Sequence, residues 1–278
     1  LVGSEMCIRD SSSSIKTLRL LYPEMQIVGN AKTLQMLDGY YGIHTLTREV
    51  KEGESISLGK KNLSFYMAPM VHWPEVMVTY CPEHKVLFSA DAFGTFGALN
   101  GGILDSQLSL DHFWDEMRRY YACIVGKYGA PVQKALQKLS GLPIETLCST
   151  HGPVWQQEIG RVIGIYDQLS RYEGEPGVVI AYGSMYGNTA QMAEKIAREL
   201  AVQGVKNIIV YNLSYADISN VIRDIFKYDT LIVGSPTYNG ELFPEVGSLL
   251  QKISERCIPC RKFAYFGSYT AVSYTHLT

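Results

Sequence analysis

The chain has 278 residues, a length that predicts two domains at about 150 residues each. Its 46% hydrophobic and 19% charged residues are typical of a globular protein and exclude a disordered tail or a collagen-like fibre. The 25 Lys and Arg nearly balance the 27 Asp and Glu, without a basic stripe, so we expect neither nucleic acid nor anionic membrane as a partner. No stretch reaches the roughly 18 apolar residues that cross a bilayer, and residues 1–10 lack a signal-peptide pattern. The six scattered cysteines then predict reduced thiols in the cytoplasm.

The first half of the chain mixes helical and extended patterns. Helices are expected near 15–22, 31–40, 111–139 and 158–169. Strands are expected at 44–50, 55–58, 63–67, 77–80, 86–89 and 144–148. Glu83, His84 and Lys85 form the predicted hairpin turn between the strands 77–80 and 86–89. This order predicts an α+β domain rather than a repeated strand–helix–strand unit.

A polar segment at 171–177 contains two glycines and a proline and follows a helical pattern. It is typical of a linker, so the expected domains are 1–170 and 178–278. After it, short apolar strands at 178–181, 208–211, 230–233 and 262–266 alternate with helical stripes near 192–200, 218–225 and 246–253. Apolar strands that alternate with amphipathic helices predict a doubly wound parallel sheet, covered by helices on both faces.

The loop 183–189 joins the first strand and first helix of the second domain. It carries Ser184, Met185, Tyr186, Gly187, Asn188 and Thr189. Small and hydroxylated residues at a helix N-terminus let backbone N–H groups converge on a phosphate, and no lysine follows as in a nucleoside-triphosphate loop. By itself the loop is more typical of an ordinary strand–helix turn, in which Thr189 can cap the helix.

Two further loops favour the phosphate interpretation. Residues 234–240 follow the third strand and residues 267–270 follow the fourth, and a doubly wound sheet binds its ligand at the carboxyl ends of its strands. The three loops together resemble those of flavodoxins, which implies FMN. By that resemblance the loop 184–189 holds the phosphate. The flavin ring is then bordered by Ser235, Pro236, Thr237, Tyr238, Asn239, Gly240, Ser268 and Tyr269, with Tyr238 and Tyr269 as stacking candidates.

Three candidate metal ligands follow strands in the first half. His72 lies in His-Trp-Pro, Asp91 in Asp-Ala-Phe-Gly and His151 in Thr-His-Gly-Pro. Imidazole and carboxylate ligands suit iron, zinc or manganese. A single histidine would more simply be a hydrogen-bonded structural residue, but three such residues at strand ends favour a metal site.

These motifs resemble the metallo-β-lactamase-like domain of flavodiiron proteins, in which a flavodoxin-like domain follows as it does here. The resemblance implies that Asp91 bridges two iron ions, with His72 on one and His151 on the other. It further implies an oxidoreductase that passes electrons from FMN to the diiron site and reduces O2 to water, NO to N2O, or both. A rubredoxin or a flavin or NAD(P)H reductase would be the electron donor, and a head-to-tail homodimer would bring flavin and iron together.

The chain departs from that family at both ends. The family's H-x-E-x-D-H motif would fall on Met6, Ile8, Asp10 and Ser11, of which Asp10 alone fits. Residues 1–10 and 271–278 look foreign to the fold, and the last strand and helix of a flavodoxin domain are missing. We therefore expect a fragment with weak metal and FMN binding and little turnover.

Two other functions remain open from the sequence. A zinc hydrolase of the metallo-β-lactamase type fused to a flavodoxin module would use the same Asp91 and His151. An electron carrier with a purely structural first domain is the other. His44, His84 and His112 have no place in the motif, and the pair Cys257 and Cys260 is expected to be structural.

Overall fold

The computed structural model describes residues 12, 14–258 and 261–269. The expectations for residues 1–11, for Cys260 and for 271–278 therefore lie outside the described residues. The chain divides into two compact units. Unit 1 comprises the described residues within Leu1–Gly94, Ala98–Leu108 and Lys134–Gly160, and unit 2 those within Thr95–Gly97, Ser109–Gln133 and Arg161–Thr278.

A six-stranded sheet forms the centre of unit 1, with the strand order β3-β4-β5-β6-β7-β8. Its strands are β3 (Ser55–Ser57), β4 (Asn62–Met67), β5 (Met77–Cys81), β6 (Val86–Phe88), β7 (Thr146–Cys148) and β8 (Val154–Trp155). Tyr80, Leu87, Leu147 and Trp155 are paired in register from β5 to β8, and all four are buried. This row of large side chains explains the hydrophobic positions that recur in these short segments.

The strand directions place three loops at the same sheet edge. β4 and β6 are both antiparallel to β5, and β6 is parallel to β7. β4, β6 and β7 therefore run in the same direction, so the loops that follow them leave the sheet at one edge. These are the loops that carry His72, Asp91 and His151.

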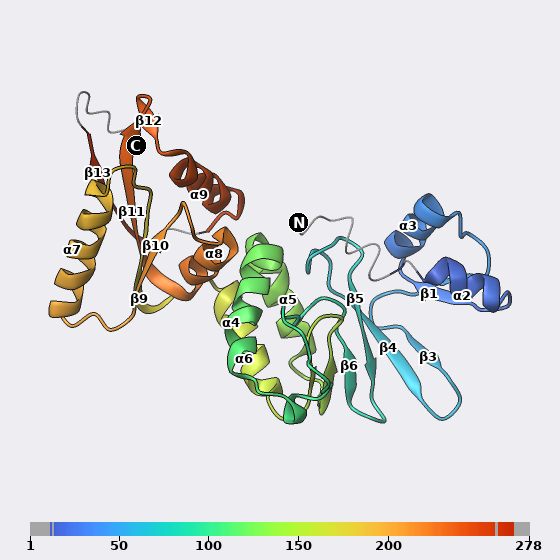
Figure 1. The fold of residues 1–278 in the computed structure, drawn as a ribbon. Helices are drawn as coiled ribbons and strands as arrows, with labels where there is room; N and C mark the ends of the chain where they lie inside the picture. The colour runs from blue at the N-terminus through green and yellow to red at the C-terminus, as the bar shows by residue number, and fades with distance from the viewer. Residues whose placement is uncertain (1–11, 13, 259–260, 270–278) are drawn as a thin grey trace. The chain divides into compact units, whose positions relative to one another are not determined.

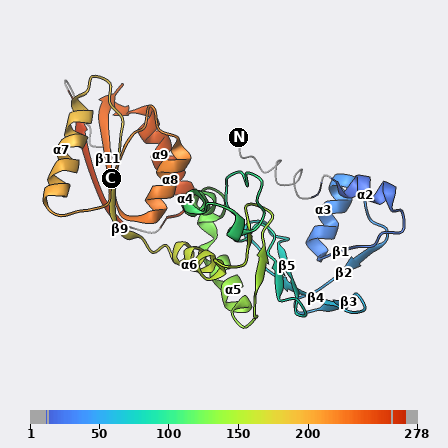
Figure 2. The ribbon, with the colours of Figure 1, turned by 60° about the horizontal axis from the view of Figure 1, so that its bottom comes forward.

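A smaller layer precedes the large sheet in the chain (Figure 2). It consists of α2 (Ile15–Leu21), β1 (Ile27–Gly29), α3 (Ala31–Tyr41) and β2 (Thr47–Glu49), and β1 pairs in parallel with β2. Asn30 caps α3 by accepting a hydrogen bond from the N–H of Thr33, and Gly42 ends it at φ 66°. Of the strand expected at 44–50, residues Thr47–Glu49 alone are extended, and β1 was not expected at all.

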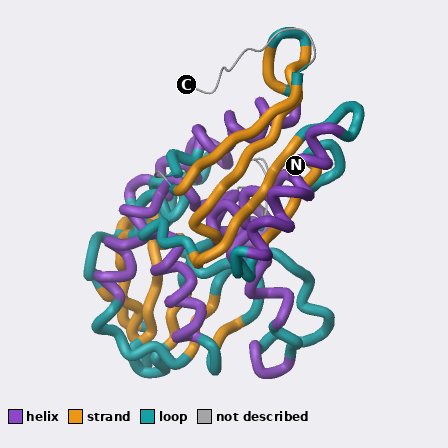
Figure 3. Tube along the Cα trace, turned by 90° about the vertical axis from the view of Figure 1, so that its left-hand side faces the viewer, coloured by secondary structure: helices purple, strands orange, loops and turns teal. Residues whose placement is uncertain are grey.

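Unit 2 contains the doubly wound sheet, as the sequence predicted. Its strands are β9 (Glu175–Tyr182), β10 (Ile208–Asn212), β11 (Tyr228–Tyr238), β12 (Glu241–Leu242) and β13 (Lys262–Ser268). β10, β9, β11 and β13 are parallel neighbours in that order, and Figure 3 shows strands in orange beside helices in purple. β9 is the first of these strands in the chain. β10 lies on one side of it and β11 on the other, so the strand order of the sheet reverses between β9 and β11.

Three helices cover the two faces of this sheet: α7 (Asn188–Val202) on one, α8 (Ile218–Lys227) and α9 (Pro244–Glu255) on the other (Figure 1). β9 is an inner strand, and Val178 to Ala181 are at most 6% exposed because helices lie on both faces of the sheet. β9 begins at Glu175, so part of the expected linker 171–177 is strand. None of the helices that the structure describes has the length and apolar character needed to cross a membrane.

The helical segment expected at 111–139 is interrupted. α4 (Asp111–Tyr120) ends in a π-helical turn at Tyr121–Val125, and a 3₁₀ turn at Gly126–Tyr128 leads into α5 (Gly129–Leu139). Gly126, Gly129 and Pro131 explain the break, because glycine and proline disfavour a continuous helix interior. α4 packs in unit 2 against α8, where Lys227 Nζ lies 3.0 Å from Asp115 Oδ1. The compact unit that contains the second sheet thus also includes α4 and most of α6 (Ile159–Ser170). The domain limits 1–170 and 178–278 stay a prediction from sequence.

Candidate metal and flavin sites

The structure brings the three predicted metal ligands together at one edge of the large sheet. His72 Nε2 lies 3.3 Å from Asp91 Oδ2, and His151 Nε2 lies 3.6 Å from Asp91 Oδ1. Each imidazole therefore faces a different oxygen of one carboxylate. Asp91 is buried, at 8% exposed, and both histidines are partly buried. A carboxylate between two imidazoles is the arrangement that a ligand shared by two metal ions requires.

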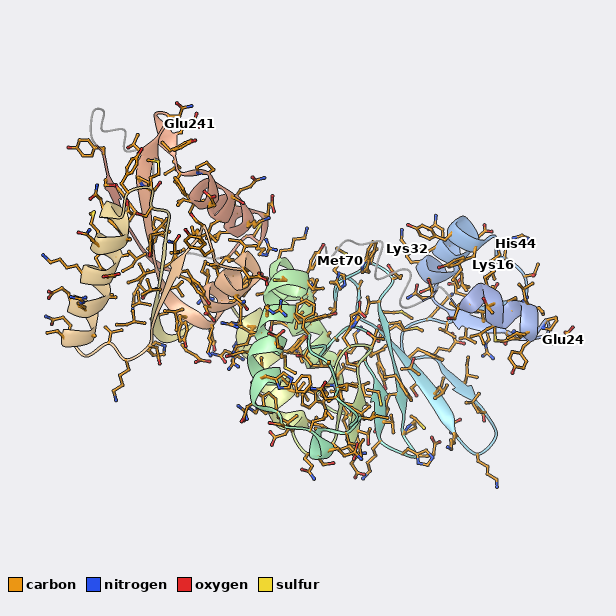
Figure 4. All side chains as sticks on the ribbon, viewed as in Figure 1. Lys16, Glu24, Lys32, His44, Met70 and Glu241 are labelled. Atoms are coloured by element: carbon orange, nitrogen blue, oxygen red, sulfur yellow. The ribbon has the colours of Figure 1, made fainter. Side chains whose placement is uncertain are left out.

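Tight loops hold these side chains in place. Ala90, directly before Asp91, has φ 52°, and Met70, two residues ahead of His72 on the loop after β4, has φ 67° (Figure 4). The fully buried Ser89 donates its hydroxyl to the carbonyl of Ala92 at 2.7 Å. This bond closes a turn around Asp91, so the backbone that carries its side chain has little freedom.

The loop of His151 is joined to the loop of Asp91. The N–H of Thr150 donates to the carbonyl of Ala90 at 3.0 Å, and the Ser149 hydroxyl donates to the same carbonyl at 3.2 Å. The Thr150 hydroxyl donates to Asp91 Oδ1 at 2.5 Å. Sequence analysis missed Thr150, although it directly precedes His151.

The surroundings of Asp91 favour its ionised form. Burial alone raises the pKa of this carboxyl, but the hydrogen bonds from His72 and Thr150 and the charges of both imidazoles outweigh burial and hold the pKa below its ordinary value. Asp91 is therefore a carboxylate, the form that binds metal ions.

An open cavity of about 310 Å³ lies beside this carboxylate. Asp91, Thr150 and Glu75 line it, together with apolar side chains such as Met36 and Val76. Glu75 Oε2 is buried, and among the described residues it has no hydrogen-bond partner. Burial raises the pKa of Glu75. Small apolar molecules therefore have a place to approach Asp91.

The donor set fits a pair of metal positions that share Asp91. Each position would have one imidazole and one carboxylate oxygen, and iron(II) accepts both donor types. Within the described ranges, no group of three His, Cys, Asp or Glu side chains that could hold one metal ion is present. The described residues thus supply two donors to each metal and no complete set. Asp10, the further candidate, lies outside the described residues.

The predicted phosphate loop lies at the N-terminus of α7. Gly187 is the N-cap residue at φ 87°, a conformation that glycine adopts without strain. The Ser184 hydroxyl accepts hydrogen bonds from the N–H groups of Gly187 and Ala190, at 3.2 and 3.4 Å. The expectation that Thr189 caps α7 is wrong. Its hydroxyl instead lies 2.9 Å from that of Ser268, at the carboxyl end of β13, and Thr189 is 1% exposed.

The two remaining flavin segments are more regular than the predicted loops. β11 continues through Ser235, Pro236 and Thr237 to Tyr238, then turns at Asn239 and Gly240 into β12, close to the labelled Glu241 in Figure 4. Ser268 is likewise the last residue of β13. A Cβ on Gly267 would meet the carbonyl oxygen of Ser235 at 2.7 Å, so these strand ends approach each other closely because a glycine stands there. Long strands were missed because loop-forming residues dominate their ends.

Each of these three segments carries an exposed tyrosine. Tyr186, Tyr238 and Tyr269 are 86%, 44% and 64% exposed, so their rings are accessible to a flat ligand. Tyr238 packs edge-on against Phe243, with ring centroids 5.9 Å apart. The Ser235 hydroxyl is occupied within its own segment, since it donates to the carbonyl of Pro236 and accepts from the N–H of Phe243. The geometry fits a flavin whose phosphate meets the N-terminus of α7 and whose ring meets exposed tyrosines.

Comparison with known proteins agrees with the two domains. A family model described as ODP family beta lactamase matches residues 9–152, just over half of the chain, and a flavodoxin model matches residues 180–275. The solved flavodiiron protein of Giardia intestinalis superposes with a TM-score of 0.89 at 27% identity, over 94% of this chain and 64% of that one. The chain belongs to the flavodiiron protein family.

Two further relatives support the assignment to flavodiiron proteins. A protein of Moorella thermoacetica named nitric oxide reductase is 32% identical over 88% of this chain. A structure named rubredoxin oxygen:oxidoreductase, from Desulfovibrio gigas, has a TM-score of 0.88 at 27% identity over 94% of this chain. This flavodiiron chain spans 61% of the length of the Moorella protein and 66% of the Desulfovibrio chain.

The other polar candidates of this flavodiiron chain lie in a surface ion pair, in a turn, at a helix start and after a helix. His44 pairs with Asp38 at 3.2 Å on the surface, and His84 lies in the predicted turn between β5 and β6. His112 is at the start of α4, and Cys257 is an exposed free thiol.

Proposed function

We propose that the chain is the core of an oxidoreductase that carries electrons from FMN to a two-iron centre and reduces O2 to water, NO to N2O, or both. The observation that carries the proposal is the Asp91 carboxylate, whose two oxygens face His72 and His151 separately. The names of the relatives support both substrates, because one is called a nitric oxide reductase and another an oxygen oxidoreductase.

The residues at the metal site would bind the metal ions and fix their positions. Asp91 would bridge the two ions, with His72 holding one and His151 the other. Two iron ions bound there would supply redox chemistry and the positive charge that stabilises a reduced diatomic molecule. The cavity lined by Glu75, Val76 and Asp91 would admit a small apolar molecule and limit the water around it.

The residues at the flavin site would hold the phosphate without a strong cation. N–H groups at the start of α7 and the hydroxyls of Ser184 and Thr189 would meet the phosphate. Tyr238 and Tyr269 would flank the ring. A rubredoxin or a flavin or NAD(P)H reductase in the cytoplasm would supply electrons, and a head-to-tail homodimer would bring the two sites of different subunits together.

A zinc hydrolase is the second candidate, because imidazole and carboxylate donors also suit zinc and the matching family model is described as a beta lactamase. Metal and flavin analysis of the purified chain after anaerobic loading with Fe2+, Zn2+ and FMN distinguishes the two. We expect Fe2+ and FMN to bind, both weakly and with little turnover of NO or O2, because the described residues give each metal position two donors and no complete ligand set. Zinc in place of iron, together with ester or thioester hydrolysis, would refute the oxidoreductase.

FMN binding is expected to weaken about fivefold or more in the variant Thr189→Ala. The loss of a hydroxyl contact to an anion costs about 1 kcal/mol or more, and here it also removes the bond to Ser268. Fluorescence titration of FMN measures the change. Ser214→Ala, which removes an exposed hydroxyl after β10 outside the proposed flavin segments, is the control and should bind like the wild type. Equal affinity of Thr189→Ala and wild type would contradict the assignment of this loop.

A further inference from the structure

We propose that Thr150 is a positioning residue of the metal centre, whose hydroxyl fixes the rotation of the Asp91 carboxylate so that each oxygen faces a different histidine. The inference rests on the proposed function, since it concerns the same site. It adds a residue that ligates no metal itself.

Chemistry decides which group donates the hydrogen bond between Thr150 and Asp91. The distance between Thr150 Oγ1 and Asp91 Oδ1 is 2.5 Å, typical of a hydroxyl bound to an ionised carboxylate. A carboxylate only accepts, so the hydroxyl donates. Oδ1 is also the oxygen that faces His151, whereas Oδ2 faces His72.

A carboxylate needs such an anchor because its terminal torsion is soft. The rotation of an aspartate carboxyl group about its last bond is broad and roughly twofold, so backbone alone does not select one orientation. Bridging two metal ions requires one orientation, with one oxygen directed to each side. The Thr150 hydroxyl selects it by holding Oδ1.

Thr150 is suited to this role because its own position is fixed. Its N–H donates to the carbonyl of Ala90, the residue before Asp91. The hydroxyl and the carboxylate therefore sit on two loops joined by a backbone hydrogen bond. The branched Cβ of threonine also limits its χ1 rotamers, so the hydroxyl is directed with little entropy cost.

Co2+ titration of the chain, followed by visible absorption, tests the proposal with three variants. Thr150→Val keeps the shape and removes the hydroxyl, and we expect about 10- to 100-fold weaker Co2+ binding, the range seen when a residue that orients a ligand is lost. Thr150→Ser keeps the hydroxyl and should bind within about threefold of wild type. Ser149→Ala is the control for loop contacts, because it removes the hydroxyl that donates to the carbonyl of Ala90 and accepts from the N–H of His151, without touching the Asp91 carboxylate.

If Thr150→Val and Ser149→Ala weaken Co2+ binding equally, the bonds merely hold the loops together and the proposal is wrong. Unchanged Co2+ binding in Thr150→Val would also overturn it. Crystal structures of the metal-free wild type and Thr150→Val separate this inference from the proposed function. We expect the Asp91 carboxylate to rotate in the variant, and an unrotated carboxylate would overturn the role of Thr150. Absence of Co2+ binding to the wild type would instead contradict the metal centre, and the two metal-free structures would still decide the role of Thr150.

Discussion

Replacement of Asp91 by asparagine is expected to abolish binding of both metal ions rather than one. Asparagine has nearly the same shape, but it is neutral and offers one oxygen in place of two. One of the two metal positions loses its shared oxygen outright, and the other keeps a weaker, uncharged donor. Since loss of an orienting neighbour alone weakens metal binding about 10- to 100-fold, loss of the shared ligand should exceed about 100-fold at both positions. Metal analysis after dialysis measures the result.

Two variants make this outcome specific. His72→Gln should release one metal and retain the other, because its imidazole faces Oδ2 alone. Asp38→Asn is the matched control, since Asp38 forms an exposed carboxylate–histidine pair with His44 and is not one of the proposed ligands. It should bind like the wild type. Loss of a single metal ion in Asp91→Asn would contradict the bridging role.

Replacement of Asp105 by alanine is expected to destabilise unit 1 by about 2–4 kcal/mol. Asp105 is 2% exposed, and its Oδ2 accepts the N–H groups of Gln156, Gln157 and Glu158 at 2.8–3.0 Å. Its Oδ1 accepts the N–H of Ser106 at 2.8 Å. Alanine leaves these four donors without their charged acceptor, and hydrogen bonds to charged groups contribute about 1.5–3 kcal/mol each before relaxation and water compensate.

Urea unfolding followed by tryptophan fluorescence measures this loss, because the buried Trp155 is adjacent to Gln156. Asp38→Ala, an exposed aspartate in the same unit, should change the free energy of unfolding by less than about 1 kcal/mol. Asp105→Asn should lower the free energy of unfolding by an amount between those of Asp38→Ala and Asp105→Ala, since its amide keeps one acceptor oxygen. A change below about 1 kcal/mol in Asp105→Ala would show that water replaces the carboxylate.

The sequence predicted the fold where hydrophobic periodicity was strong. The apolar runs of β9 and β10 and the stripe of α7 were found because burial on one or two faces dictates their pattern. β1, β8 and β12 were missed, and β8 and β12 have two residues each, too few to show a period. Their strand character comes from pairing with a neighbouring strand: β1 with β2, β8 with β7 and β12 with the end of β11.

The ligand residues of the metal site were also predictable, because His72, Asp91 and His151 each follow a strand. Their convergence depends on β4, β6 and β7 running in one direction, which the strand pattern alone leaves undetermined. The bond of Thr189 to Ser268 and that of Thr150 to Asp91 were missed for the same reason. They join residues from different strand ends, and no local pattern encodes such pairs.

Anomalous diffraction at the iron absorption edge, from crystals of the chain loaded with Fe2+ under anaerobic conditions, tests the central claim most directly. We expect two iron peaks, one between His72 and Asp91 and the other between His151 and Asp91. A single peak, or iron bound away from Asp91, would contradict the bridged two-metal centre.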